Sequence, residues 1–134
     1  MKNLDVMELR RKLKNEGKLT EEILDIMSKI YGNRFSKAVE AVKKGRIKKY
    51  VFEPSGKIIW IVVGKKCDYI VLPKVGFCSC NDFYYRIMKG ESSLCYHLIA
   101  CWIAEATGQF DLIKEEDRLY DFLLNDWKKS IFKY

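Results

Sequence analysis

The chain has 134 residues, a formal net charge of +7, 49% hydrophobic residues and 13% aromatic residues. This length fits one domain with a core of its own, and the composition excludes an intrinsically disordered chain. No apolar run approaches the roughly 20 residues of a membrane-spanning helix, and the charged start of the chain is unlike a signal peptide, so we expect no membrane association.

Helical spacing of apolar residues marks the first part of the chain. The pattern runs from about residue 4 to residue 16, and a glycine follows it. Thr20 is a candidate N-cap for a second helix, which is predicted to end before Gly32. A third helix is predicted over about residues 33–45. The sequence therefore predicts a helical N-terminal layer over residues 1–46.

The positive charge is concentrated in this same region. Residues 1–49 hold 14 Lys and Arg against 7 Asp and Glu, whereas residues 50–134 hold eleven of each. A one-sided positive field favours phosphate groups, although a basic run is also typical of a solvated helix surface. The candidate nucleic-acid-binding residues are the five at the densest point, Lys43, Lys44, Arg46, Lys48 and Lys49.

The pattern then changes to strands. Residues 50–52, 58–63 and 69–72 are rich in β-branched and aromatic side chains, and turn-forming residues separate them. We predict an antiparallel β-meander whose end delivers the first of two cysteine-containing pairs.

These pairs are Cys78-Ser79-Cys80 and, after fourteen residues, Cys95-Tyr96-His97. Zn²⁺ binds thiolate and imidazole ligands in a tetrahedron, and two short pairs joined by a loop are typical of structural sites. The alternatives are ordinary buried cysteines and a disulfide framework. The paired spacing argues against the first, and the absence of a secretion signal argues against the second. We predict one structural zinc ion held by Cys78, Cys80, Cys95 and His97.

A helix is predicted from about residue 94 to Thr107, with Ser92 or Ser93 as its N-cap. This would place Cys95 and His97 in the first helical turn. Cys67 and Cys101 are predicted not to be ligands. Because four protein ligands close a zinc site to water and substrate, we predict that the protein is not an enzyme.

The end of the chain, residues 109–134, is predicted as a helical tail, since its apolar residues recur at helical spacing. Together with the helical layer at 1–46 and a finger region at 47–108, this predicts one compact domain. The predicted fold class is α+β, with N-terminal helices, an antiparallel meander, a ββα-like finger and a C-terminal helix.

The order Cys-x-Cys…Cys-x-His resembles the SWIM-type zinc finger. Phe77 precedes the first pair, Phe83 follows the second cysteine by three residues, and Ala100 stands three residues after the histidine. This ending is similar to that of the SWIM subunit of the Shu complex, a homologous-recombination mediator. The chain departs from the pattern at Asn81, where proline often stands, and at Tyr96, where lysine often stands.

The resemblance implies a zinc-binding accessory protein of homologous recombination and DNA repair. Its partners would be a RecA-family recombinase paralogue and single-stranded DNA, contacted directly or through that paralogue. Ala100 would serve in packing or in partner binding. The alternative is a stand-alone nucleic-acid-binding or regulatory zinc protein that uses the basic N-terminal region. We expect a cytoplasmic, nucleoid-associated location, or a nuclear one if the source is eukaryotic.

Overall fold

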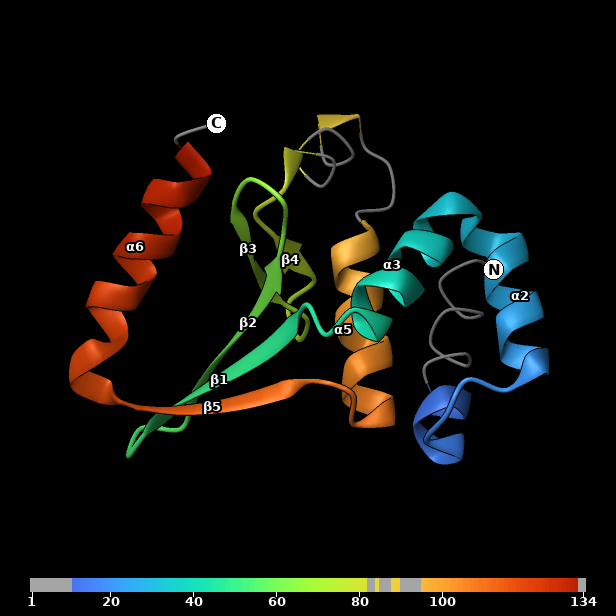
Figure 1. Ribbon diagram of the computed structural model, residues 1–134, viewed down its shortest axis with the longest axis horizontal. Helices are drawn as coiled ribbons and strands as arrows, with labels where there is room; N and C mark the ends of the chain where they lie inside the picture. The colour runs from blue at the N-terminus through green and yellow to red at the C-terminus, as the bar shows by residue number, and fades with distance from the viewer. Residues whose placement is uncertain (1–10, 82–83, 85–87, 90–94, 133–134) are drawn as a thin grey trace.

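A five-stranded sheet separates two groups of helices in the computed structural model, which describes residues 11–81, 84, 88–89 and 95–132 (Figure 1). On one side lie α2 (Glu21–Tyr31), α3 (Asn33–Lys43) and α5 (Tyr96–Thr107). On the other side lies α6 (Tyr120–Phe132). The fold is α+β, as the sequence predicts. No helix among the described residues is long and apolar enough to cross a bilayer.

The predicted capping residues explain where the first helices begin and end. Residues 11–16 are helical, and the N–H of Gly17 donates to Leu13 at their end. The Thr20 side chain accepts a hydrogen bond from the N–H of Ile23, so it is the N-cap of α2 as predicted. Gly32 has φ 58°, a conformation that favours glycine, and there the chain turns from α2 into α3. The predicted start of the first helix lies outside the described residues.

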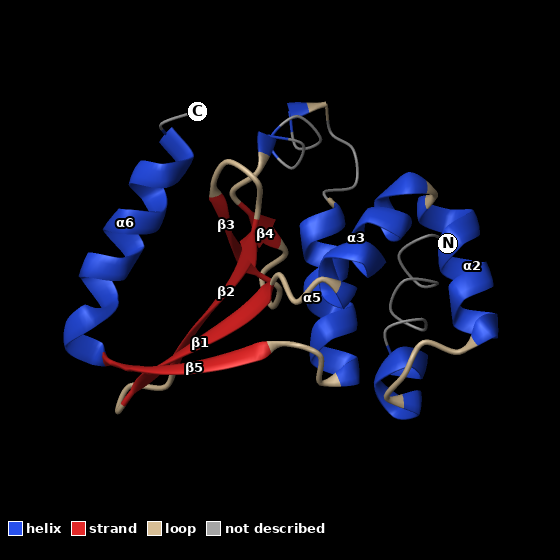
Figure 2. Ribbon diagram, in the orientation of Figure 1, coloured by secondary structure: helices blue, strands red, loops and turns tan. Residues whose placement is uncertain are grey.

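The sheet has the order β4-β3-β2-β1-β5 (Figure 2). The strands are β1 (Ile47–Glu53), β2 (Lys57–Val63), β3 (Asp68–Leu72), β4 (Phe77–Cys78) and β5 (Asp111–Glu116). The first four pair antiparallel, in register pairs such as Tyr50 with Ile59 and Val71 with Cys78. The predicted meander is therefore present, and its last strand ends at the first cysteine pair.

The fifth strand corrects the prediction for residues 109–134. Residues 111–116 are not helical but form β5, which pairs parallel to β1. Ser55, in the turn after β1, donates from its N–H and its hydroxyl to the carboxylate of Asp117, directly after β5. The helical part of the tail starts after this contact, with the 3-10 turn η1 (Asp117–Leu119) and α6.

Two hydrophobic clusters fill the two sides of the sheet, because successive side chains of a strand point to opposite faces. The first cluster joins α2, α3 and α5 to the face that carries Trp60 and Val71. The second joins α6, through the buried Trp127, to the face that carries Phe52 and Ile70. The ring of Tyr50 meets Trp127 edge to face, with centroids 4.8 Å apart. The predicted apolar stripe of the C-terminal helix is thus a core contact.

Candidate metal centre

Two structural elements carry the four predicted ligands to one place. Cys78 ends β4, and Cys80 follows it after one residue. Cys95 and His97 come from the start of α5. All four side chains are buried, and no two of their donor atoms are more than 4.8 Å apart. Residues that are 19 apart in the sequence thus meet within the first core cluster. We call this group the Cys₃His cluster.

Ser79 fixes the first pair on the sheet. Its hydroxyl accepts a hydrogen bond from the N–H of Ile70 at 2.9 Å, and its own N–H donates to the Ile70 carbonyl at 3.0 Å. These bonds extend the pairing with β3 past the end of β4. Side chains on either side of Ser79 point away from that of Ser79 itself. Cys78 and Cys80 therefore face the same way, toward α5.

The start of α5 fixes the second pair. Cys95 is the N-cap of the helix, with extended backbone angles of φ −87° and ψ 167°, whereas His97 is inside the first turn. This corrects the prediction that both residues lie in the first turn. Because Cys95 is the N-cap, the prediction that Ser92 or Ser93 caps this helix is also wrong. At the other end, Gly108 closes α5 in the left-handed conformation as predicted, with φ 72°.

The distances and the donor types fit zinc. Tetrahedral Zn–S and Zn–N bonds of about 2.3 and 2.0 Å place sulfur and nitrogen about 3.6 Å apart. In the structure, Cys78 Sγ and His97 Nδ1 are 3.6 Å apart. Three thiols and one imidazole form a known structural set for Zn²⁺, whereas hard cations such as Mg²⁺ prefer oxygen ligands. The Cys₃His cluster is thus suited to one zinc ion, held through Nδ1 of the histidine.

The electrostatics of the three sulfurs also favour a cation. The pKa of Cys95 is lowered to about 3, chiefly because the thiols of Cys78 and Cys80 donate to its sulfur. The N–H groups of Leu98 and His97, at the positive end of α5, act in the same direction. The pKa of Cys78 is raised, because its thiol donates to the neighbouring sulfurs and is buried. The thiolate form is therefore favoured at Cys95, next to the start of the helix.

Two tyrosines hold the imidazole ring of His97. The ring centroid lies 4.3 Å from that of Tyr69 on β3 and 4.0 Å from that of Tyr96 on α5. The remaining ring nitrogen, Nε2, is buried and has no hydrogen-bond partner among the described residues. Ligating histidines are usually oriented by a hydrogen bond to that second nitrogen. Here the tyrosine rings restrict the orientation of the imidazole instead.

Sequence reasoning did not assign a role to either tyrosine. Tyr96 was a departure from the family pattern, and the structure gives it a place beside the histidine. The Nζ atom of Lys37 on α3 lies 6.0 Å from the centroid of the Tyr96 ring. The pKa of the Tyr69 hydroxyl is raised to about 12, chiefly because the hydroxyl is buried. A hydrogen bond between the side chains of Tyr69 and Cys67 is the second cause. A tyrosine two residues after a hairpin turn carries no signal that marks it as a neighbour of a metal site.

Gly64 permits the position of Tyr69. A Cβ atom there would lie 2.5 Å from the carbonyl oxygen of Cys67 and 2.8 Å from Cε2 of Tyr69. Both distances are below van der Waals contact, so any larger residue would displace the turn or the tyrosine ring. Gly64 is thus a positioning residue for the imidazole, through Tyr69.

Tyr69→Leu is expected to lower the zinc affinity about 10- to 100-fold, the usual effect of losing a group that orients a metal ligand. Gly64→Ala should have a similar but smaller effect, since it moves the same ring. Competition with a chromophoric zinc chelator measures both. The matched control is Tyr69→Phe, which keeps the ring and should keep the affinity within about threefold of the parent. Parental affinity in Tyr69→Leu would show that stacking does not orient the histidine.

The other predicted residues are placed as follows. Cys67 and Cys101 lie outside the Cys₃His cluster among the described residues. Ala100 is fully buried on α5, inside the first core cluster. Of the basic run, Lys43 ends α3 and Lys44 follows it, whereas Lys48 and Lys49 belong to β1.

The basic residues of β1 do not share a surface. Lys48 and Lys49 are consecutive in the strand, so they point to opposite faces of the sheet. Lys49 Nζ lies 5.3 Å from the ring centroid of Trp60, on the α5 side, and 5.7 Å from that of Phe110. Lys44 forms an ion pair with Glu40 at 2.5 Å. The structure thus divides the predicted nucleic-acid-binding run between α3 and both faces of the sheet.

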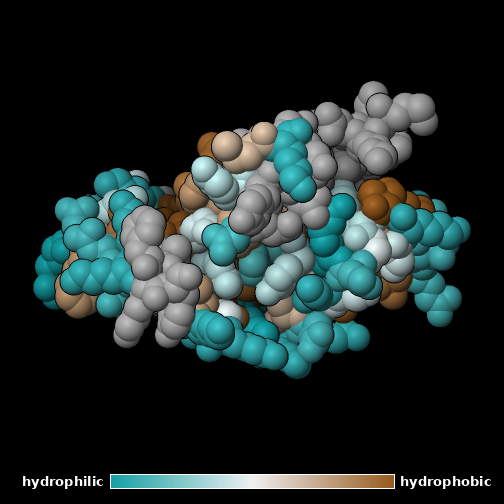
Figure 3. Space-filling view, turned by 90° about the horizontal axis from the view of Figure 1, so that it is seen from above, coloured by the Kyte–Doolittle hydropathy of each residue, from teal (hydrophilic) through white to brown (hydrophobic). Residues whose placement is uncertain are grey.

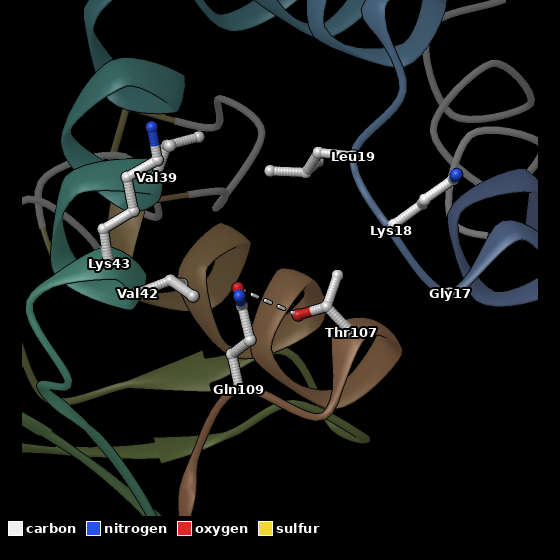
Figure 4. A pocket seen from close by; sticks show the side chains of 8 residues that line it. All are labelled: Gly17, Lys18, Leu19, Val39, Val42, Lys43, Thr107 and Gln109. Atoms are coloured by element: carbon white, nitrogen blue, oxygen red, sulfur yellow. Dashed lines mark hydrogen bonds between the residues drawn. The ribbon is translucent and has the colours of Figure 1, made fainter.

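Lys43 lines a cavity of about 280 Å³ between α3, the end of α5 and the segment that precedes α2 (Figure 4). The side chains of Leu19 and Val42 point into it, and the Thr107 hydroxyl donates to Gln109 along one side. The amine of Lys18 points away from it. Among the described lining residues, Lys18 and Lys43 therefore do not converge as the cations of a phosphate site would.

The fold is α+β, and the four buried side chains form a site suited to one structural zinc ion. Over 99% of its length the chain is 29% identical to the zinc finger SWIM domain-containing protein 7 homolog of Dictyostelium discoideum, and the alignment covers 86% of that relative. An 83-residue segment, 62% of the chain, is 40% identical to an uncharacterized protein of Archaeoglobus fulgidus and covers 64% of it. No family model matches the chain. The resemblance to SWIM-type zinc-finger proteins is thereby confirmed.

Proposed function

We propose that the protein is a zinc-binding accessory protein of homologous recombination, which binds a RecA-family recombinase paralogue and supports its action on single-stranded DNA. The observation that carries the proposal is the Cys₃His cluster of a chain that resembles a SWIM zinc-finger protein over nearly its whole length. The recombination role itself follows from the resemblance to the SWIM subunit of the Shu complex.

The metal has a structural task in this proposal. Bound zinc would be held by Cys78, Cys80, Cys95 and His97, and it would supply a fixed link between the end of the sheet and the start of α5. All four ligands are buried, with His97 only 4% exposed. Four protein ligands fill the coordination sphere of a tetrahedral ion, so no position remains for a reacting water. The protein is accordingly proposed to bind partners rather than to catalyse a reaction.

Affinity capture tests the proposed partner. The tagged, zinc-loaded protein is incubated with a native lysate of its source, with and without nuclease, and the bound proteins are identified by mass spectrometry. A RecA-family ATPase that is retained after nuclease treatment supports the proposal. Recovery of nucleic acid without such an ATPase would favour the alternative, a stand-alone nucleic-acid-binding zinc protein. One observation favours that alternative, namely the concentration of the net charge of +7 in residues 1–49.

A lysine variant separates the two functions. Each phosphate contact to a single strand adds about 0.7 to the slope of log affinity against log salt concentration. Because the basic run is divided over several surfaces, we expect its removal to change this slope for a 20-nucleotide oligo(dT) by less than about 0.7. Capture of the ATPase should be unchanged. The variant replaces four residues by Ala: Lys43, Lys44, Lys48 and Lys49.

The matched control removes the same charge from exposed positions elsewhere. A loss of two phosphate contacts would lower the slope by about 1.4. If the first variant lowers the slope by at least this much and the control variant does not, direct DNA binding by the basic run is established. The control variant replaces Lys14, Lys18, Lys66 and Lys129 by Ala.

A further inference from the structure

An apolar groove of about 1010 Å³ lies between α6 and the edge of the sheet that carries β3 and β4. We call it the α6 groove. Its walls come from β2, β3, the turn before β4, the first cysteine pair and α6. Figure 3, seen from above, shows brown hydrophobic atoms between α6 on the left and the centre of the molecule. Its apolar lining includes Ile58, Leu72, Val75, Phe77, Tyr84 and Leu124.

Exposed apolar surface is concentrated in this groove. Val75 is 75% exposed, Tyr84 61% and Phe77 39%, and all three line the groove. These three are among the seven large hydrophobic residues that are exposed in the described part of the chain. Single exposed apolar residues are normal on a protein surface, whereas a contiguous apolar hollow marks a binding site. The volume is sufficient for several side chains of a bound segment.

The charged residues that line the α6 groove indicate which kind of partner it would bind. The charged residues among those described in the lining are Lys57 and Lys128, and no carboxylate is among them. Lys57 Nζ lies 4.4 Å from the ring centroid of Tyr120, which fixes it near the α6 wall. Two cations beside an apolar floor complement apolar side chains that are flanked by carboxylates. Two lysines are few for a nucleic-acid strand, and the floor is largely aliphatic, so phosphates and bases are less well matched.

We propose that the α6 groove binds a protein partner through an amphipathic peptide segment whose apolar side chains are flanked by Asp or Glu. This inference rests on the proposed function only in that the chain acts by binding a protein. Cys78 and Cys80 are among the residues that line the groove, while their side chains face α5 on the other side of the sheet. Zinc, by holding these two cysteines, would also hold that part of the groove wall in place.

Peptide selection tests the proposal without a known partner. A phage-displayed library of random 16-residue peptides is selected on the full, zinc-loaded protein, and the selected sequences are synthesised for affinity measurements by fluorescence anisotropy. We expect peptides with several apolar residues next to Asp or Glu. Val75→Glu and Lys128→Glu should each weaken their binding at least tenfold. Val75 is mostly solvent-exposed, so its substitution should leave the fold intact, which circular dichroism checks.

The matched control is Leu112→Glu, which introduces the same charge at a 54% exposed position on the edge strand β5. It should not alter binding. The proposal is overturned if no peptide is selected, if the selected peptides are basic, or if Val75→Glu and Leu112→Glu act alike. Competition by oligo(dT) would instead assign the groove to nucleic acid. A dimer in sedimentation velocity that Val75→Glu dissociates would assign it to a second copy of the chain.

These outcomes are separable from those of the lysate capture. If a RecA-family ATPase is captured but Val75→Glu and Leu112→Glu bind the selected peptides alike, the groove proposal fails and the proposed function stands. If the selected peptides bind the groove as described but no RecA-family ATPase is captured, the groove proposal stands and the proposed function fails.

Discussion

Replacing Cys95 by Ala is expected to abolish stoichiometric zinc binding and to unfold the finger region at ambient temperature. Cys95 is one of the four predicted ligands, its pKa is lowered by the neighbouring thiols, and it is the N-cap of α5. Its loss removes a ligand and the link between α5 and the end of β4. Zinc binding supplies on the order of 10 kcal/mol in small structural sites, which is comparable to the stability of a whole domain. Elemental analysis should give about one zinc per chain for the parent and much less for the variant.

The control for this prediction is Cys101→Ala. Cys101 is also a fully buried thiol on α5, but it is outside the Cys₃His cluster. The same chemical change there should keep the zinc and lower the melting temperature only modestly. Removal of the metal from the parent with a strong chelator should reproduce the effect of Cys95→Ala. A chelated protein that keeps the parental melting curve would show that the metal is not structural.

Local signals explain which parts of the fold could be predicted. Thr20 caps α2 because its hydroxyl is next to free N–H groups, and Gly108 ends α5 because glycine accepts a positive φ. The two ligand pairs are close in sequence, so chemistry alone links them to one ion. Each of these depends on a few neighbouring residues.

The parts that could not be predicted depend on distant residues. Residues 111–116 carry charges at most positions and lack the apolar alternation of a strand. They form β5 because the edge of β1 is free to pair with them, a contact between segments more than 60 residues apart. An edge strand with charged side chains is common, since charge blocks unwanted pairing. The local pattern therefore does not distinguish this strand from the helical tail predicted over residues 109–134.

The contact between the rings of Tyr69 and His97 also depends on residues that are distant in the sequence. It results from the register of β3 with β2 and from the space that Gly64 leaves. The ligands could be read from the sequence, whereas the residues that orient them required the fold.

The second large effect is expected at Ala100, which the family resemblance links to packing or to partner binding. Ala100 is fully buried, and it shares the first core cluster with other small residues of the packed helices α3 and α5, Ala38, Ala41 and Ala104. Small side chains at such positions allow two helices to approach closely. A partner has no access to the Ala100 side chain in this arrangement, so the residue should act through packing.

Ala100→Leu is therefore expected to destabilise the protein by about 1–3 kcal/mol, the usual cost of overpacking a core, and to lower the melting temperature by roughly 4–12 °C. Ala100→Arg should destabilise the protein more than Ala100→Leu, because it buries an unpaired charge. The zinc content should stay near one per chain, and any loss of partner capture should follow the loss of folded protein. The control is Ala106→Leu, at a half-buried position of the same helix. If Ala100→Leu instead kept the parental melting temperature but lost the partner, the side chain would contact the partner directly, and the buried packing role would be wrong.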